Sequence, residues 1–208
     1  MSAKMRATPS RGEEKRPYRK RRRAEQEEET RLRITEAAVE LHGSVGPART
    51  TISAVAEKAG VQRATVYRHF PDEVALFGAC SAHWAMQHPL PDVEVWAAIA
   101  DPEERLRVAL GQLYAWFADG EEMLENVIRD GVSVPAMQGP VEAVRAWLAY
   151  AAEALLRGRP ERGRRRLLAR AAIGHALAFE TWRSLVREQG LSQEEAVELM
   201  VALAAHRG

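Results

Sequence analysis

Residues 50–70, TTISAVAEKAGVQRATVYRHF, constrain the fold of this chain more than any other segment. Apolar residues recur at helical spacing in the first half, and Gly60 then ends the helix where a left-handed backbone costs least. Thr51 is placed to cap this helix, because its hydroxyl can accept hydrogen bonds from the amides of the opening turn. A second helix begins at about Gln62. The segment therefore predicts a helix-turn-helix, an arrangement that fits the major groove of DNA.

The exposed side of the second helix separates this interpretation from an ordinary helical hairpin. Arg63 has the reach and the planar fork to bind guanine O6 and N7. Ala64 and Thr65 are small, so the helix can approach the bases closely and their methyl groups can contact thymine. Arg68 and His69 fit either phosphate contacts or a solvated helix end. The predicted DNA-binding residues are Thr51, Gln62, Arg63, Ala64, Thr65, Tyr67, Arg68 and His69.

A specific pattern runs through this region: Thr51, Ala56, Ala59-Gly60-Val61, Thr65-Val66-Tyr67, His69-Phe70 and Leu76-Phe77. The pattern resembles the DNA-binding domain of the TetR family of transcriptional regulators, and it covers about residues 30–80. The resemblance implies that Thr51 and Tyr67 donate their hydroxyls to phosphates. The chain departs from the family at Glu73, where a phosphate-binding lysine is usual, and at Gln62, where a serine-type cap is usual. Both departures should weaken binding to the DNA backbone.

Charge is spread unevenly along the chain, although the net charge is only +1. Residues 1–23 hold ten basic and two acidic residues, whereas residues 24–88 hold six basic and nine acidic residues. Phosphate neutralisation supplies most of the nonspecific affinity for DNA, so a negative helix-turn-helix segment needs compensation. Residues 1–23 have almost no apolar residues and are predicted to be disordered in the free protein. They fit either a solvated tail or an arm that lies along phosphates or enters a minor groove.

The predicted fold class is all-α. About nine helices form a three-helix helix-turn-helix domain with its connecting helix, followed by a helical ligand-binding and dimerisation domain, and an arm precedes both. The arm is residues 1–23, the helix-turn-helix domain with its connecting helix is residues 24–88, and the ligand-binding and dimerisation domain is residues 89–208. The prolines after His88 mark the boundary. In the second domain, Asp101 and Ser192 are predicted helix caps, and one helix is predicted over about residues 165–188. The arginine-rich stretch 157–166 fits a solvated connection better than a second DNA site.

The sequence contains no recognisable catalytic arrangement, so no enzyme, cofactor or metal site is predicted. Its six histidines are scattered, and neither a nucleotide-binding loop nor a cysteine–histidine metal pattern occurs. Cys80 is the single cysteine; it fits a small buried apolar group better than a redox sensor. No apolar run is long enough to cross a membrane and no signal peptide is recognised. These features predict a soluble cytoplasmic protein without a membrane partner.

The second domain shares only its helical layout and length with the ligand-binding half of the family. At least half of its aromatic residues are expected in the core. The predicted ligand contacts are Trp116, Trp147, Tyr150, His175, Phe179 and Trp182. The last two helices are predicted to pair with those of a second copy, through Leu168, Ala172, Leu199, Met200 and Leu203.

The leading hypothesis is a homodimeric transcriptional repressor bound to a palindromic double-stranded operator. A small apolar or aromatic effector would release it, because such a guest suits an aromatic pocket. An activator and a regulator controlled by a protein partner are alternatives with the same fold. A helical binding protein without a DNA role is an alternative from a different class.

Overall fold

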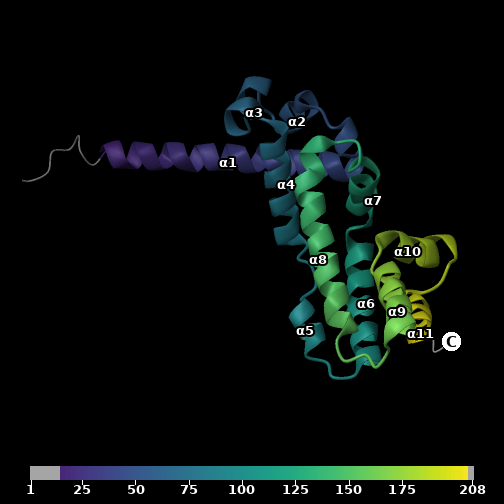
Figure 1. The fold of residues 1–208 in the computed structure, drawn as a ribbon. Helices are drawn as coiled ribbons and strands as arrows, with labels where there is room; N and C mark the ends of the chain where they lie inside the picture. Colours follow the sequence, from purple (N-terminus) through teal and green to yellow (C-terminus); the bar gives the residue numbers. More distant parts are fainter. Residues whose placement is uncertain (1–14, 206–208) are drawn as a thin grey trace, which may run out of the picture.

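The computed structural model describes residues 15–205, and this part of the chain is helical throughout. It contains eleven α-helices, two short 3₁₀ turns and one π-helical segment, and its described residues form no strand. Figure 1 shows α2 and α3 at one end of the molecule, and α9 and α11 near the opposite end. The all-α fold class is confirmed.

The first half of the chain forms the unit that contains the predicted helix-turn-helix. A long helix, α1 (Lys15–Ser44), leads through a 3₁₀ turn, η1 (Pro47–Arg49), into α2 (Ile52–Lys58) and α3 (Arg63–His69). The connecting helix α4 (Glu73–Gln87) follows. These helices share a compact apolar core that continues into the first turns of α4; its fully or nearly fully buried members include Ile34, Ala38, Val55, Val66 and Phe70.

The second half packs around a larger core. Its elements are α5 (Val93–Ala97), α6 (Pro102–Asp119), α7 (Glu121–Asp130), η2 (Pro135–Met137), α8 (Gln138–Leu156), α9 (Gly163–Ala176), α10 (Phe179–Arg183), the π-helical segment (Ser184–Glu188) and α11 (Gln193–Ala205). Trp96, Tyr114 and Trp182 are fully buried in this core. Because the two cores meet only around α4 and α7, we propose a domain boundary after α4, near His88.

The predicted boundary at residue 23 does not correspond to a structural break. α1 begins at Lys15, so residues 15–23 are helical rather than disordered, while residues 1–14 lie outside the described part. Arg21 pairs with Glu25 at 2.8 Å and Arg23 pairs with Glu27 at 3.1 Å. The acidic run that follows the basic residues therefore supports the helix through pairs four residues apart.

The predicted helix over residues 165–188 is interrupted near its middle. α9 ends at Ala176, and Ala178 adopts an extended backbone before α10 begins. The Thr181 hydroxyl donates to the carbonyl of His175 at 2.7 Å, which draws the chain into a local turn. This break and the short α5 account for two helices more than the sequence pattern indicated. So short an interruption has no apolar periodicity that would predict it.

The arginine-rich stretch 157–166 is not simply a solvated connection. Arg159 is 3% exposed, and its Nη1 donates to the carbonyl of Ala204 at the end of α11. The arginine therefore ties the α8–α9 connection to the last helix. Other members of the stretch, including Arg164 and Arg166, lie exposed or half-buried at the start of α9.

A polar contact joins α7 to the loop between α1 and α2. We call Asn126, Arg129 and Asp130 the α7 latch. The Asp130 carboxylate accepts a hydrogen bond from the backbone amide of Ala48 at 3.0 Å, and the Asn126 amide donates to the carbonyl of Gly43. Arg129 donates to Asp130 at 2.7 Å. The domains are thus connected by the latch as well as by α4.

Candidate nucleic-acid interface

The helix-turn-helix is held together by the local signals that the sequence provides. The Thr51 hydroxyl accepts from the amide of Ala54 at 3.1 Å, and Gly60 adopts a left-handed backbone with φ of 65°. Val66 and Phe70 of α3 are buried against α1 and α2. The apolar side of α3 is therefore fixed, and its opposite side is left for solvent.

The structure brings most of the predicted DNA-binding residues to one exposed face. Gln62, Arg63, Ala64, Tyr67 and Arg68 are all exposed along α3 and at its N-terminal cap position. Thr65 is half-buried. Thr51 is exposed at the start of α2. An arginine near the beginning of α3 and small residues beside it match the geometry that reads bases in the major groove.

His69 is less suited to phosphate binding than its neighbour Arg68. The His69 ring is half-buried, and its Nε2 is buried without a hydrogen-bond partner within the described residues. Burial, with the Arg68 and Arg31 charges beside it, lowers the pKa of His69 below its usual range. The ring is therefore neutral at neutral pH and offers no positive charge to a phosphate.

Arg31 fixes the C-terminal end of α3, a role that the sequence pattern did not reveal. Its Nη1 donates to the carbonyl of His69 at 2.9 Å, and its guanidinium lies over the ring of Phe70 at 4.3 Å. A cation at a helix C-terminus also interacts favourably with the helix dipole. Arg31 lies 38 residues before His69, so no local signal could have paired them.

The two departures from the family pattern are visible at helix starts. Gln62 occupies the N-cap position of α3, but its side chain makes no capping hydrogen bond. Glu73 begins α4, directly after the cap residue Asp72, whose carboxylate accepts from the amide of Ala75 at 2.8 Å. Glu73 is exposed, and its carboxylate has neither an ion pair nor a hydrogen bond to any described residue.

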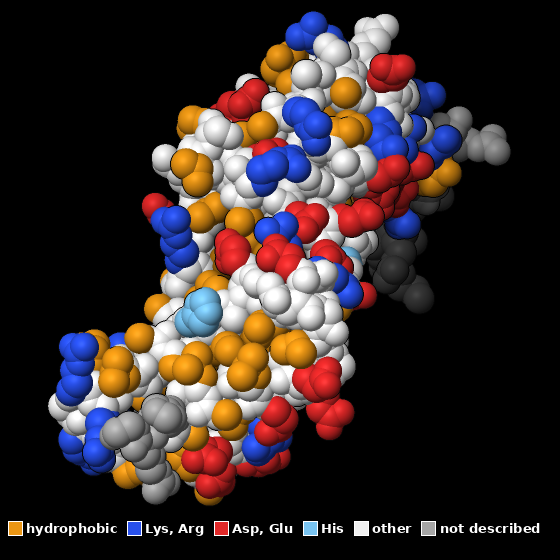
Figure 2. Space-filling view, turned by 90° about the vertical axis from the view of Figure 1, so that its right-hand side faces the viewer, with side chains coloured by type: hydrophobic (Ala, Val, Ile, Leu, Met, Phe, Trp, Pro, Cys, Tyr) orange, Lys and Arg blue, Asp and Glu red, His pale blue; other side chains and the backbone are white. Residues whose placement is uncertain are grey.

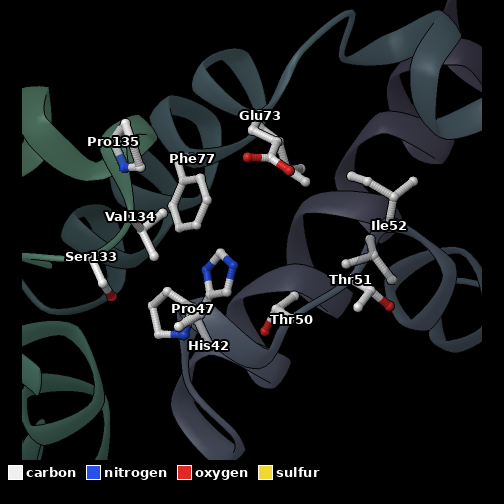
Figure 3. A pocket seen from close by; sticks show the side chains of 13 residues that line it. His42, Pro47, Thr50, Thr51, Ile52, Glu73, Phe77, Ser133, Val134 and Pro135 are labelled. Carbon is white, nitrogen blue, oxygen red and sulfur yellow. The ribbon is translucent and has the colours of Figure 1, made fainter. Parts of the chain in front are cut away.

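A pocket of about 210 Å³ lies at the junction of the two domains, close to this interface. Figure 3 shows His42, Phe77 and Glu73 around its hollow, with Thr50 and Pro135 on opposite sides. His42 is 5% exposed and stacks on Phe77, with ring centroids 4.7 Å apart. Burial lowers the pKa of His42 to about 4. No local sequence pattern indicates this site, because its walls come from five separate elements.

The predicted ligand contacts are divided among three places rather than gathered around one cavity. Trp147 packs edge-on against Trp96, and the Tyr150 hydroxyl donates to Glu94, on the α5–α8 side. Phe179 and Trp182 belong to a buried cluster with Phe117. Trp116 and His175 complete the predicted set. Trp116 borders this cluster and contacts Trp84, whereas His175 is exposed and lines a pocket of about 240 Å³ with Thr181 and Met200.

The predicted dimer residues separate into exposed and buried members. Leu168, Leu199 and Leu203 are 55%, 46% and 48% exposed, Ala172 is half-buried, and Met200 is buried at 6%. Met200 therefore belongs to the core of its own chain. Figure 2 shows the side of the molecule that carries α9–α11, where hydrophobic side chains gather between charged groups. An apolar patch bordered by charge is typical of a protein–protein interface.

The basic start of α1 is the densest positive charge near the helix-turn-helix. Residues 15–23 contain seven lysine and arginine residues and no acidic residue, and in Figure 1 this part of α1 projects well beyond α4.

We expect deletion of residues 1–23 to lower DNA affinity. A plot of the logarithm of the binding constant against the logarithm of the salt concentration should also become shallower, by about 0.9 for each phosphate that is no longer neutralised. Deletion of residues 1–14 alone removes three basic and two acidic residues and should change the slope little. Fluorescence anisotropy at several salt concentrations measures both; equal slopes for the full chain and the longer deletion would place this helix in solvent.

The described part of the chain is helical, and α3 packs its apolar side on the core that it shares with α1 and α2 while its other side is exposed. This arrangement defines the class of helix-turn-helix DNA-binding proteins. Residues 34–80 match the profile of the bacterial regulatory proteins of the tetR family. This part of the chain therefore belongs to the TetR family of transcriptional regulators. Proteins of this family are regulators of transcription, not enzymes.

Curated relatives match less than half of the chain. The helix-turn-helix transcriptional regulator SrpR of Pseudomonas putida is 38% identical over 87 residues, which are 38% of this chain and 40% of SrpR. The regulator TtgW, also of Pseudomonas putida, is 37% identical over 87 residues, covering 38% of this chain and 63% of TtgW. The matches therefore span less than two thirds of either relative.

Solved structures share the whole layout at low sequence identity. A TetR-like transcriptional regulator from Rhodococcus sp. RHA1 has a TM-score of 0.58 and 22% identity, over 84% of this chain and 93% of its own. The regulator FadR from Bacillus subtilis, solved in complex with stearoyl-CoA, has a TM-score of 0.57 and 20% identity, over 84% of this chain and 97% of its own. These likenesses extend the shared fold into the second domain. Among the described helices, none combines the length and apolar character needed to cross a membrane.

Proposed function

We propose that this protein is a homodimeric repressor that binds a palindromic operator through α3 and is released by a small apolar or aromatic effector. The observation that carries the proposal is the exposed face of α3, on which Arg63, Ala64 and Tyr67 are accessible to solvent. One helix-turn-helix covers one half-site, so useful affinity requires two of them about 34–36 Å apart. The exposed leucines of α9 and α11 offer the surface for that pairing.

The effector part of the proposal draws on the aromatic cluster of Phe117, Phe179 and Trp182. Trp182 is fully buried, yet its Nε1 has no hydrogen-bond partner within the described part of the chain. A buried donor without an acceptor costs free energy, and a guest with an acceptor would recover it. FadR from Bacillus subtilis, which has a similar fold, was solved in complex with stearoyl-CoA, a ligand that carries a long apolar acyl chain. An effector releases DNA only if it binds the released form more tightly than the DNA-ready form.

An activator of the same fold is the second proposal, since α3 would contact DNA in the same way. A repressor and an activator differ in where the operator lies relative to the promoter. A reporter gene controlled by an operator selected from a random duplex library measures whether the protein lowers or raises expression. Lower expression with the protein than without it supports repression.

The proposal predicts distinct losses for two substitutions on α3. Duplexes selected from a random library should carry an inverted repeat, and Arg63→Ala should cost about 1–3 kcal/mol on the selected duplex while relaxing preference at one base pair per half-site. Tyr67→Phe should weaken selected and random duplexes equally, because a phosphate contact carries no sequence information. Competition binding measures both ratios. Equal losses on both duplexes for Arg63→Ala would remove this arginine from base recognition, and failure to enrich any sequence would refute the DNA-binding proposal.

A further inference from the structure

We propose that the pocket at the domain junction binds a small cation consisting of one aromatic ring and a primary ammonium group, and that this ligand strengthens DNA binding. The pocket is bordered by α1, η1, α2, α4 and the segment before η2, so a ligand in it touches both domains (Figure 3). Binding itself is independent of the function proposed above. The effect on DNA rests on that function.

The size and walls of the pocket suit one ring. A cavity of about 150 Å³ accepts benzene, and drug-sized ligands need about 300–1,000 Å³. The junction pocket, at about 210 Å³, lies between these limits. Its walls include Pro47, Ile52, Phe77, Val134 and Pro135, which are apolar and come from both domains. An aromatic ring would bury its faces against these side chains.

His42 supplies a polar group to the wall of the pocket. It is nine-tenths buried and lines the pocket, and its ring nitrogens have no hydrogen-bond partner among residues 15–205. A neutral imidazole carries one donor and one acceptor nitrogen. Figure 3 shows its ring at the hollow beneath Phe77. A guest with a polar hydrogen beside its ring would satisfy a group that the protein leaves unpaired.

Glu73 decides the charge of the guest. Its carboxylate borders the hollow in Figure 3 and lacks an ion-pair partner in the described part of the chain, while no lysine or arginine is among the 13 lining residues. The site therefore attracts a cation and disfavours an anion. A primary ammonium also has three donors, which suit a carboxylate and nearby hydroxyls. Thr50 and Thr51 line the same pocket on the side of α2.

The position of Glu73 links occupancy to DNA binding. Glu73 begins α4, three residues after α3 is capped by Phe70, and it adds negative charge beside the face that meets phosphates. An ammonium held on Glu73 cancels that charge. DNA affinity should then rise a few-fold at low salt, and the gain should shrink as salt screens the charges.

Three probes of one size test the site: benzylamine, benzyl alcohol and benzoate. Each is titrated into the full chain while the His42 ring resonances are followed by NMR. Benzylamine should shift them and bind about fivefold more tightly than benzyl alcohol, as expected for a partly exposed ion pair. Benzoate should bind most weakly. Glu73→Gln should make the amine and the alcohol equal, whereas Glu57→Gln, an exposed carboxylate outside the pocket, should leave the difference unchanged.

The outcomes separate the site from the proposed function. Equal binding of amine and alcohol by the wild-type chain, or an undiminished preference in Glu73→Gln, would overturn the site. Anisotropy with the selected duplex then tests the coupling: benzylamine should raise the affinity of the wild type and not of Glu73→Gln. Unchanged affinity despite amine binding would overturn the coupling. A chain that binds no DNA at all refutes the proposed function and leaves the NMR titration as the test of the pocket.

Discussion

Replacement of both Leu199 and Leu203 by glutamate is expected to give a folded monomer that binds operator DNA about a hundredfold to ten-thousandfold more weakly than the wild type. Both leucines are about half exposed in the single chain, on a helix that packs beside α9. In a two-fold dimer the two substitutions place four glutamates in one apolar interface. Association would then bury like charges next to each other, which costs free energy. Loss of the second half-site then removes the gain that linkage provides. Sedimentation velocity measures the assembly state, and anisotropy measures the affinity.

A matched pair of substitutions controls for general effects of charge. Val95 and Val144 are 52% and 45% exposed on α5 and α8, two helices that carry none of the predicted dimer residues. Their replacement by glutamate adds the same charge, and the variant should remain dimeric and bind DNA. Both variants should unfold cooperatively, and the dimeric control should be the more stable of the two because association stabilises the folded chain. A leucine variant that still sediments as a dimer places the interface elsewhere.

The features that the sequence predicted correctly are those whose partners lie within one helical turn. Thr51 caps α2 through the amide three residues later, and Gly60 has the left-handed backbone that the turn requires. Asp101 accepts from the amides of Glu103 and Glu104 at the start of α6. Such contacts depend on a few neighbouring side chains, so their residue types reveal them. The division into buried and exposed sides of α3 follows from its apolar spacing for the same reason.

The features that the sequence did not reveal join positions far apart in the chain. Asp130 contacts Ala48 across 82 residues, and Arg159 contacts Ala204 across 45 residues. An aspartate near a helix end and an arginine in a basic stretch both fit a solvated surface when only their neighbours are considered. The predicted ligand contacts lie in three separate places for the same reason. Aromatic spacing indicates which side of a helix is buried, but not which other helix covers it.

The largest expected loss of stability from a single methyl group is at Gly46. Its backbone has φ of 96° and ψ of 154°, a conformation that other residues rarely adopt and that costs of the order of 1–3 kcal/mol. An added Cβ would lie 2.1 Å from Arg129 Nη2 and 2.5 Å from Asp130 Oδ2. The α7 latch would have to move, leaving the buried Asp130 carboxylate without its ordinary partners. We expect Gly46→Ala to lower the free energy of unfolding by about 2–5 kcal/mol in total.

Urea unfolding of the full chain measures this loss, and Gly78→Ala is its matched control. Gly78 lies inside α4 with open space around its Cβ position, so alanine there should stabilise the helix by about 0.5–1 kcal/mol.

Asp130→Asn separates the latch from the backbone effect, because it keeps the shape of the side chain and removes the charge that Arg129 and Ala48 bind. Hydrogen bonding from Arg129, the largest cause, lowers the pKa of Asp130, so its contribution is present at neutral pH and is lost only as pH falls through that lowered value. The difference between wild type and Asp130→Asn should therefore be constant from about pH 6 to 8 and shrink in acid. If Gly46→Ala unfolds at the same urea concentration as Gly78→Ala, the latch does not hold the α1–α2 loop against α7.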